Sequence, residues 1–243
     1  EREPAKLPWG ELGIDLVVES TGIFLSPEKA NLHLDAGAKR VLLSAPPKGD
    51  GILQVVHGVN HDAIDPDMAI VSAASCTTNS FVPVMYVLEK DIGVAHALLT
   101  TVHGYTGDQR LVDSPHAKPS RSRAAAINIV PTTTGAAKAT TKILPSLEGK
   151  MDGVAFRVPV ATGSVSDVTA ELKREVSVDE VNALFRRYAQ GELSGVLGVS
   201  DDPLVSSDVI GDDCPSVVDL TTTRVVDGRF VKVMAFYDNE GGY

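Results

Sequence analysis

Short apolar runs that alternate with a helical pattern constrain the fold of the first 75 residues most. Residues 14–18 and 40–43 are predicted as strands, because turn-forming residues follow each run. Between them, Ser26-Pro27-Glu28 has the pattern of a helix start, with a capping serine and a proline at the first helical position. Two further runs, at 55–56 and 69–71, are also predicted as strands. Strands that alternate with a helix predict a parallel, doubly wound sheet.

That unit is incomplete as a nucleotide-binding fold, which opens with a strand, a G-x-G-x-x-G loop and a helix. Nothing in the sequence matches that loop, and the chain begins at Glu1 without a methionine or an apolar leader. We therefore expect a fragment of a longer protein.

The chain changes character from residue 76 onward. Helices are predicted over 77–90 and 178–190, and strands over 98–102, 153–160, 165–172 and 229–237. The polar stretch 104–123 is long for a structureless loop, which is typical of a functional segment. Alternation within 230–237 gives one more polar face, as in an antiparallel sheet.

Composition and charge exclude several classes of protein. Hydrophobic residues make up 43% of the 243 residues and charged residues 22%, which is ordinary for a folded domain. A net charge of −10 argues against binding to nucleic acid or to a membrane surface. Cys76 and Cys214 have no metal-ligand spacing, so we expect no metal site and a reducing compartment.

The strongest local signal is Ser75-Cys76-Thr77-Thr78-Asn79, where a predicted strand passes through a polar turn into a helix. A cysteine at a helix N-terminus has a stabilised thiolate and a lowered pKa, and nearby N–H groups can hold an oxyanion. A small buried thiol is the structural alternative. The residues alone leave both interpretations open. Cys214, in a Gly-Asp-Asp-Cys-Pro turn, is interpreted as incidental.

His103 ends an apolar strand beside the long polar stretch. A structural role is common for such a histidine, and the sequence leaves that role open. A nucleophilic cysteine, however, needs a base, which can be remote in sequence. Of the six histidines, His103 alone lies at a strand end beside a polar loop, so it is the candidate partner of Cys76.

Cationic and hydroxyl side chains gather in or near turns of this acidic chain. They are Thr106, Arg121, Arg123, Thr134 with Gly135, and Arg157. Arg157 lies within an apolar strand, where a charge is unusual unless it is paired or faces a site. The Thr134-Gly135 step opens a helix, whose N-terminus can bind an anion. Ordinary capping and surface arginines are the alternative.

In their order along the chain, these motifs resemble the phosphorylating glyceraldehyde-3-phosphate dehydrogenase family. The resemblance covers essentially the whole sequence. The segments that carry it are Glu19-Ser20-Thr21-Gly22, Asp35-Ala36-Gly37-Ala38-Lys39, Ser75-Cys76-Thr77-Thr78-Asn79, Thr101-Val102-His103 with Tyr105-Thr106, Arg121-Ser122-Arg123-Ala124-Ala125-Ala126, Thr134-Gly135-Ala136-Ala137-Lys138, Pro203-Leu204-Val205-Ser206-Ser207-Asp208 and Asp238-Asn239-Glu240. The family has more sequence at both ends, so the first nucleotide-binding half and the last helix are expected to be missing.

The resemblance implies a fold and a division of the chain. The expected class is α/β, with a partial doubly wound nucleotide-binding half and an α+β catalytic domain with a mixed sheet. Residues 1–75 would form the partial NAD-binding, Rossmann-like domain and 76–237 the catalytic domain, with 238–243 starting the return to the NAD-binding domain. Helices would cover one face of the catalytic sheet, and the other face would be the subunit interface of a homotetramer.

The resemblance also implies oxidation of D-glyceraldehyde 3-phosphate to 1,3-bisphosphoglycerate in glycolysis or gluconeogenesis. Cys76 would attack the aldehyde to give a hemithioacetal, while His103 would raise the reactivity of the thiol and steady the developing charge. Hydride would pass to NAD, and inorganic phosphate would then release an acyl phosphate from the thioester. No nucleic acid or membrane partner is expected, and the location would be cytoplasmic.

Two anion pockets and a cofactor site are implied residue by residue. The residues that match the pockets are Ser75, Thr77, Thr106, Asp108, Arg121, Thr134, Gly135 and Arg157. The residues that match cofactor-side positions are Arg2, Thr21, Gly22, Ser44, Asn239 and Tyr243, with Asn239 at the nicotinamide amide. Pro115 matches NAD-using members better than the chloroplast NADP type. NAD is therefore expected, while NADP stays open because the selecting acidic residue is in the missing half.

Four positions depart from the family pattern. Gly107 replaces an Asn, Gly241 replaces a Trp, Ser80 replaces a second Cys, and Pro119-Ser120 precedes Arg121 where a bulky residue and an Arg are usual. The first and last of these bear on cofactor geometry and on the contacts of the loop. None involves Cys76 or His103.

Three other functions are alternatives to the oxidation of glyceraldehyde 3-phosphate. The first is the sister activity on erythrose 4-phosphate, which a rate comparison on the two aldehydes would separate. The second is a catalytically silent fragment that only binds partners. The third, a cysteine hydrolase of neutral acyl groups, does not need the arginines or the Thr134-Gly135 anion site.

Overall fold

The computed structural model describes residues 1–243, which divide into two units, Glu1–Ser75 and Cys76–Tyr243. Four parallel strands form the sheet of the first unit, in the order β1-β2-β4-β3. They are β1 (Leu16–Glu19), β2 (Arg40–Leu43), β3 (Leu53–Gln54) and β4 (Ile70–Ser72). Short 3-10 turns lie at Pro4–Lys6 and His61–Ala63. The parallel sheet predicted from the alternating runs is confirmed.

Helix α1 (Pro27–Asp35) connects β1 to β2 and begins where its sequence predicts. The Ser26 hydroxyl accepts a hydrogen bond from the Lys29 N–H (3.4 Å), and Pro27 occupies the first turn. The helix buries Ala30 against the sheet in a small core. That core contains Leu25, Ala30, Val41, Leu43 and Ile52.

The strand predicted at Val55–Val56 is displaced in the structure. β3 covers Leu53–Gln54, and Val55 adds one more bond to Ser72 O (2.8 Å). The chain then leaves the sheet because the Val56 N–H donates to the Asn60 side chain (2.8 Å) instead of to a strand. The apolar pair is therefore a core anchor at the start of a turn, and Val56 is fully buried.

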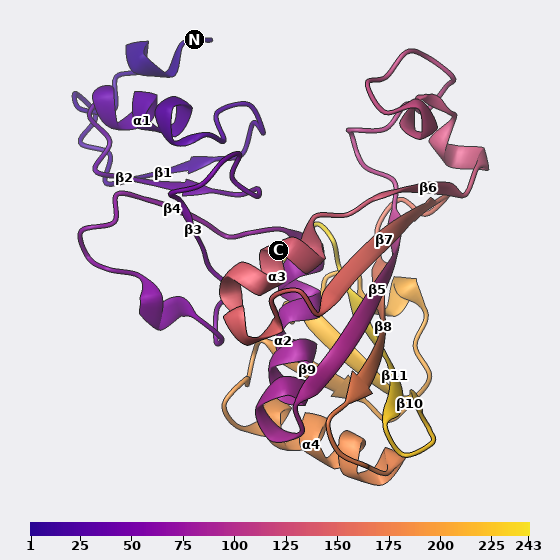
Figure 1. Ribbon diagram of the computed structural model, residues 1–243. Coiled ribbons are helices and arrows are strands. Elements are labelled where there is room, and N and C mark those ends of the chain that lie inside the picture. Colours follow the sequence, from indigo (N-terminus) through magenta and orange to yellow (C-terminus); the bar gives the residue numbers. More distant parts are fainter. The chain divides into compact units, whose positions relative to one another are not determined.

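The second unit is built on a mixed sheet of seven strands, in the order β6-β7-β5-β8-β11-β10-β9 (Figure 1). They are β5 (Val94–Gly104), β6 (Val130–Thr133), β7 (Met151–Val158), β8 (Ser164–Leu172), β9 (Leu197–Ser200), β10 (Ser216–Val226) and β11 (Phe230–Tyr237). β5 pairs with β7 and β9 with β10 in parallel, and the other pairs are antiparallel. The predicted α/β class with a mixed sheet is confirmed.

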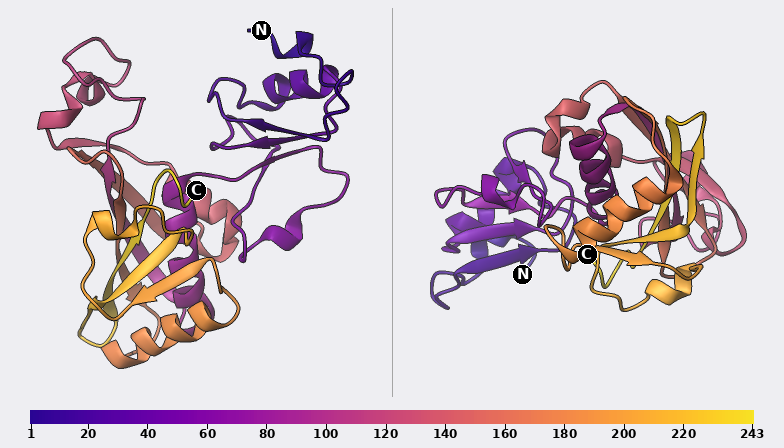
Figure 2. Two further views of the ribbon diagram at one scale, coloured as in Figure 1. Left: turned by 180° about the vertical axis from the view of Figure 1, so that it is seen from behind. Right: turned by 90° about the horizontal axis from the view of Figure 1, so that it is seen from below.

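Three helices cover one face of this sheet: α2 (Cys76–Asp91), α3 (Ala136–Ile143) and α4 (Val178–Gln190). α2 packs across β5, β8, β10 and β11, while α4 packs on β9 and β10 and also contacts α2. Figure 2 shows α2 and α4 side by side on the same side of the strands. On the opposite face, Leu98 of β5 and Val154 of β7 are exposed.

The segment between β5 and β6, residues 105–129, projects beyond the ends of these strands (Figure 1). Its only regular structure is two 3-10 turns, Pro119–Ser122 and Ala125–Ile127. Several large apolar side chains in it are exposed: Leu111, Val112, Ile127 and Ile129. The long polar stretch predicted from the sequence is thus an extended loop that begins at the end of β5.

Candidate active site

Cys76 is the first residue of α2, so the predicted helix start at this cysteine is confirmed. The approach to it is unusual, because Ala74 is buried and has a φ of 62°. Non-glycine residues seldom adopt that left-handed conformation. The Ala74 N–H is held by the Ser72 hydroxyl at 3.0 Å. Ser75 and Cys76 are each half-buried at the entry to the helix.

The structure brings together Cys76 and His103, which are 27 residues apart in the sequence. The distance between Cys76 Sγ and His103 Nε2 is 3.4 Å. His103 lies near the end of β5 and is only 2% exposed. On that strand it shares a face with the buried Leu99 and Thr101, so its side chain faces the helix-covered side of the sheet. This distance is the one that a nucleophile and its general base require.

The other imidazole nitrogen is held by the backbone. His103 Nδ1 lies 2.7 Å from Gly104 O. A proton on Nδ1 that donates to this carbonyl leaves Nε2 as an unprotonated acceptor facing the thiol. Because the Gly104 carbonyl can only accept, this contact favours the tautomer that a base for Cys76 requires.

Arg157 lies beside this pair because of the strand register. β5 and β7 are parallel, and their register places Arg157 directly opposite His103. Arg157 Nη1 donates to Gly104 O (3.1 Å) and Thr106 Oγ1 (3.3 Å), and it lies 3.0 Å from His103 Nδ1. Its Nε–H is buried and has no partner. A buried guanidinium with an unused donor is suited to an anion.

The protonation states of the pair differ from those that the helix N-terminus predicts. Burial raises the pKa of the Cys76 thiol, although the N–H and hydroxyl groups of Thr77 and the charge of Arg157 oppose that rise. Burial, and then the charge of Arg157, lowers the pKa of His103 to about 4. The expected lowering of the Cys76 pKa is therefore wrong for this structure, because burial outweighs the opposing effects of Thr77 and Arg157. At neutral pH the pair consists of a thiol and a neutral imidazole.

The sequence analysis did not identify Tyr237, which stabilises the group formed by Cys76, His103 and Arg157. We call this group the Cys76 corner. The hydroxyl of Tyr237, at the end of β11, bonds to Thr77 Oγ1 (2.8 Å) and to Thr101 Oγ1 (2.9 Å). All three side chains are buried, and the Tyr237 ring meets His103 edge-on with centroids 5.9 Å apart. The tyrosine thus ties the first turn of α2 to β5. Its place on the buried face of the alternating strand 230–237 was the available signal.

A second cationic group lies on the long loop. Arg121 pairs with the Asp108 carboxylate, and its Nε donates to Thr132 Oγ1 (3.1 Å). His116 Nε2 lies 3.6 Å from the same carboxylate. Burial alone would raise the pKa of Asp108, but pairing with Arg121 lowers it overall. The positive charge of Arg121 also lowers the pKa values of Arg157 and His103, so it acts on the Cys76 corner.

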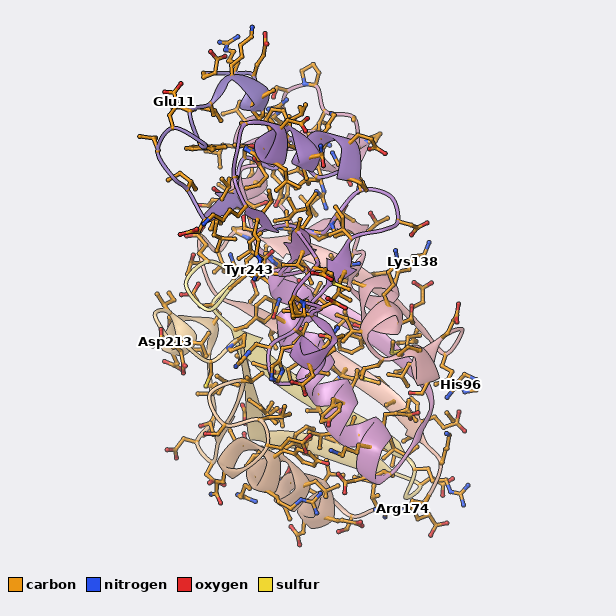
Figure 3. The ribbon with its side chains drawn as sticks, turned by 90° about the vertical axis from the view of Figure 1, so that its left-hand side faces the viewer. Glu11, His96, Lys138, Arg174, Asp213 and Tyr243 are labelled. Carbon is orange, nitrogen blue, oxygen red and sulfur yellow. The ribbon has the colours of Figure 1, made fainter.

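Thr134 and Gly135 open α3, as predicted. The Thr134 hydroxyl accepts from the Ala136 N–H (3.2 Å), and a Cβ on Gly135 would meet nothing within 4 Å. The next basic residue, Lys138, is exposed and points away from the helices (Figure 3). No hydrogen bond joins Thr134 or Gly135 directly to Cys76, His103 or Arg157, and their role in an anion pocket stays a prediction.

Asn239 lies just after β11 and is 7% exposed. Its Oδ1 accepts from the Gly163 N–H (3.1 Å) and the Ser164 hydroxyl (2.8 Å). These contacts fix which end of the amide is which, and they leave Nδ2 buried without a partner. Asp238 holds the following turn by accepting from the N–H groups of Gly211, Glu240 and Gly241. Tyr243 follows at the end of the chain, 38% exposed (Figure 3).

Comparison with known proteins now decides the family. Residues 75–239 match the family model described as glyceraldehyde 3-phosphate dehydrogenase, C-terminal domain. The curated glyceraldehyde-3-phosphate dehydrogenase of Kitasatospora aureofaciens is 55% identical over 244 residues, which cover 100% of this chain and 73% of that protein. Those of Streptomyces avermitilis (number 2) and Haloarcula vallismortis are 52% and 53% identical, covering 100% of this chain and 72% of each.

The chain belongs to the glyceraldehyde-3-phosphate dehydrogenase family. It is therefore an oxidoreductase, and the family implies a nicotinamide dinucleotide as cofactor. The chain spans about 72% of the length of these relatives. The resemblance inferred from the motifs is confirmed.

The predicted cofactor-side residues of this family member's first unit gather at the carboxyl ends of two strands. Thr21 and Gly22 follow β1, and Ser44 follows β2, at the edge where open α/β sheets bind ligands. Gly22 has a φ of 74° and open space around its Cα. Arg2 is exposed, and its backbone N–H donates to the Glu1 carboxylate (2.7 Å).

No three or more His, Cys, Asp or Glu side chains gather where they could ligate a metal ion. None of the helices combines the length and the hydropathy that a bilayer span requires.

Proposed function

We propose that this member of the family oxidises D-glyceraldehyde 3-phosphate to 1,3-bisphosphoglycerate with NAD and inorganic phosphate, through a thioester on Cys76. The observation that carries the proposal is the 3.4 Å distance between Cys76 Sγ and His103 Nε2. The unused donor of Arg157 beside this pair supports a substrate that carries phosphate.

In the first step, Cys76 Sγ forms a bond to the aldehyde carbon while its proton moves to His103 Nε2. The raised pKa of the thiol and the lowered pKa of His103 favour a transfer that accompanies the attack over a standing ion pair. The carbonyl oxygen gains the negative charge, which the imidazolium and the N–H groups that begin α2 would stabilise. A bound NAD would supply the hydride acceptor. Loss of a hydride from the former aldehyde carbon of the adduct would leave a thioester on Cys76.

In the second step, an oxygen of inorganic phosphate attacks the thioester carbon and the bond to Cys76 Sγ breaks. The departing thiolate takes back the proton that His103 held. The acyl phosphate leaves, and the thiol and the neutral imidazole are restored. His103 thus serves first as a base and then as an acid, which its fixed Nε2 position allows.

The two phosphates need separate cationic or N–H donors. We assign these roles to Arg157 and Thr106 in the corner beside His103, to Arg121 with Asp108 in the loop, and to the start of α3. Ser75 and Thr77 add the N–H groups of the α2 entry. Arg121 is positioned by Asp108 and Thr132, which leaves its charge close enough to influence His103.

The residues on the cofactor side fit a nicotinamide dinucleotide. The buried, unpartnered Asn239 Nδ2 is a donor for a carbonyl oxygen such as that of the nicotinamide carboxamide. Thr21, Gly22 and Ser44 would hold the rest of the dinucleotide, with Arg2 and Tyr243 as further contacts. We propose NAD over NADP, a homotetrameric assembly and a cytoplasmic location.

A phosphate-free mixing experiment tests the function. The intact enzyme is mixed with NAD and glyceraldehyde 3-phosphate, and NADH is followed by its absorbance. We expect one NADH per Cys76 in a burst, with turnover resuming when phosphate is added. Absence of both burst and turnover would contradict the proposal. A higher kcat/KM on erythrose 4-phosphate would assign the sister activity.

A further inference from the structure

Glu19 is the last residue of β1, and its carboxyl group is buried, with 2% of the residue exposed. It takes no part in the proposed reaction. A carboxylate is seldom buried this deeply unless every oxygen is bonded. The contacts of Glu19 therefore show what the residue does.

Glu19 is bonded to both polar residues at the carboxyl edge of the first unit's sheet. Its Oε1 accepts from the N–H of Thr21 (2.8 Å) and from the Thr21 hydroxyl. Its backbone carbonyl accepts from the N–H (3.0 Å) and the hydroxyl (3.3 Å) of Ser44. One residue thus fixes the turn after β1 and the residue after β2.

The remaining carboxylate oxygen is anchored from the opposite direction. Glu19 Oε2 lies 3.0 Å from His33 Nε2, and His33 Nδ1 accepts from Trp9 Nε1–H (3.2 Å). Because the indole can only donate, Nδ1 is unprotonated and Nε2–H donates to Glu19. His33 is 4% exposed, and Phe24 packs edge-on against it at 5.9 Å. Trp9, His33, Glu19 and Thr21 form a chain in which every donor meets an acceptor.

We infer that the Glu19 carboxylate is a positioning group for the dinucleotide, acting through Thr21, while the Glu19 backbone carbonyl holds Ser44. This inference rests on the proposed function. Thr21 and Gly22 are exposed, so without Glu19 the turn would be held only by the bond from the Ile23 N–H to Thr21 Oγ1 (3.2 Å). A turn that is already fixed spends less conformational entropy when it closes on a ligand.

The substitution Glu19→Gln tests the inference with almost no change in shape. If the amide oxygen faces Thr21, the NH₂ group meets His33 Nε2–H. If the amide is flipped, the NH₂ group meets the Thr21 N–H. If His33 changes tautomer, its Nδ1–H meets the Trp9 Nε1–H. Every arrangement therefore places one donor against another. Glu11→Gln is the matched control, because Glu11 is exposed and projects from the same unit (Figure 3).

We expect Glu19→Gln to raise the KM for NAD in the intact enzyme about tenfold or more, since a buried polar group loses its partner. The rate of Cys76 alkylation by iodoacetamide, which reports the second unit, stays within about twofold of the wild-type rate. Glu11→Gln changes neither. A double variant with Thr21→Val gives little further rise in KM, because both changes break the same contact.

Each other outcome overturns something definite. Wild-type enzyme that shows no saturable dependence on NAD would overturn the proposed function and this inference together. Saturable wild-type enzyme with equal KM values for Glu19→Gln and Glu11→Gln would overturn the inference alone, as would full additivity with Thr21→Val. If Glu19→Gln does not fold, Trp9→Phe removes only the far donor. An unchanged KM for NAD in Trp9→Phe would then assign Glu19 to stability.

Discussion

The cofactor edge of the first unit and the Cys76 corner of the second are built in different ways. Thr21 and Ser44 are small and follow neighbouring strands, and a single residue, Glu19, is bonded to both. The Cys76 corner instead gathers titratable side chains from a helix and two strands, and burial shifts their pKa values. Hydrogen bonds to one residue at a strand end position the first region, whereas helix packing and the register of two strands position the second. Substitutions at the second region should therefore act on chemistry, and those at the first on binding.

The largest expected effect on activity comes from removal of the proposed nucleophile, Cys76. We expect Cys76→Ser to reduce turnover by on the order of 10⁴-fold or more. Cys214→Ser is the control, because Cys214 lies in a turn outside the corner, and activity should stay within about twofold. Steady-state kinetics on both variants of the intact enzyme measure the two effects. Comparable losses would mean that Cys76 is not the nucleophile.

Replacement of the base comes next in size. His103→Asn keeps a polar side chain at the strand end but removes Nε2, so we expect a loss of about 10²–10⁴-fold in kcat. In the wild-type enzyme, kcat/KM should fall as the pH drops through about 4, because His103 must be neutral to accept the proton. The pH profile of the variant should lack that limb. A profile with the same limb would assign it to another group.

Arg157→Leu distinguishes anion binding from a structural role. We expect kcat/KM on glyceraldehyde 3-phosphate to fall about ten- to a few-hundredfold, the equivalent of one charged hydrogen bond. Activity on unphosphorylated glyceraldehyde should fall much less. The control is Arg186→Leu, which removes an exposed arginine paired with Asp201. Equal losses on both aldehydes would show that Arg157 supports the corner rather than the substrate.

The lowered pKa of His103 also predicts how stability depends on pH. Its pKa is 6.5 when unfolded and about 4 in the folded state, so between these values the unfolded chain binds more protons. Stability should therefore decrease as the pH falls from about 6.5 to about 4, by roughly 3 kcal/mol from this group. Urea unfolding of wild type and His103→Asn at several pH values measures the difference. Parallel curves for the two proteins would contradict the shift.

The smallest expected effect is the loss of stability when the Tyr237 hydroxyl is removed. Tyr237→Phe removes the hydroxyl between Thr77 and Thr101 and should cost about 1–2 kcal/mol of stability. Tyr105→Phe, a tyrosine whose hydroxyl is outside this network, should cost less. Thermal unfolding compares the two. An equal loss of stability would mean that the buried bonds of Tyr237 add nothing.

The sequence predicted those features that depend on neighbouring residues. The cap of α1, the start of α2 at Cys76 and the antiparallel strand that ends at Tyr237 each have a local pattern. β10 was missed because its ladder is interrupted between Asp219 and Arg224, where polar residues break the alternation. β9 was missed because it has only four residues, including a glycine.

The protonation states were beyond the reach of sequence. A helix start predicts a stabilised thiolate, but the burial that opposes it comes from the packing of α2 against β5 and β11. The contact between Arg157 and His103 likewise depends on the β5–β7 register. The roles assigned to the predicted site residues stay predictions until the variants are measured.

His103 and Arg157 are paired across two parallel strands, so their contact cannot change by small shifts of strand register. A strand can slide against its neighbour only by whole residues, and a slide of one residue turns every side chain to the opposite face. Arg157 would then point away from the helices. No smaller shift of the strands exists in which Arg157 and His103 keep part of their contact. Insertions or deletions in β5 or β7 should therefore leave the arrangement intact or abolish it outright. Changes in the length of the loop that follows β5 should leave the pair intact, because that loop lies outside both strands.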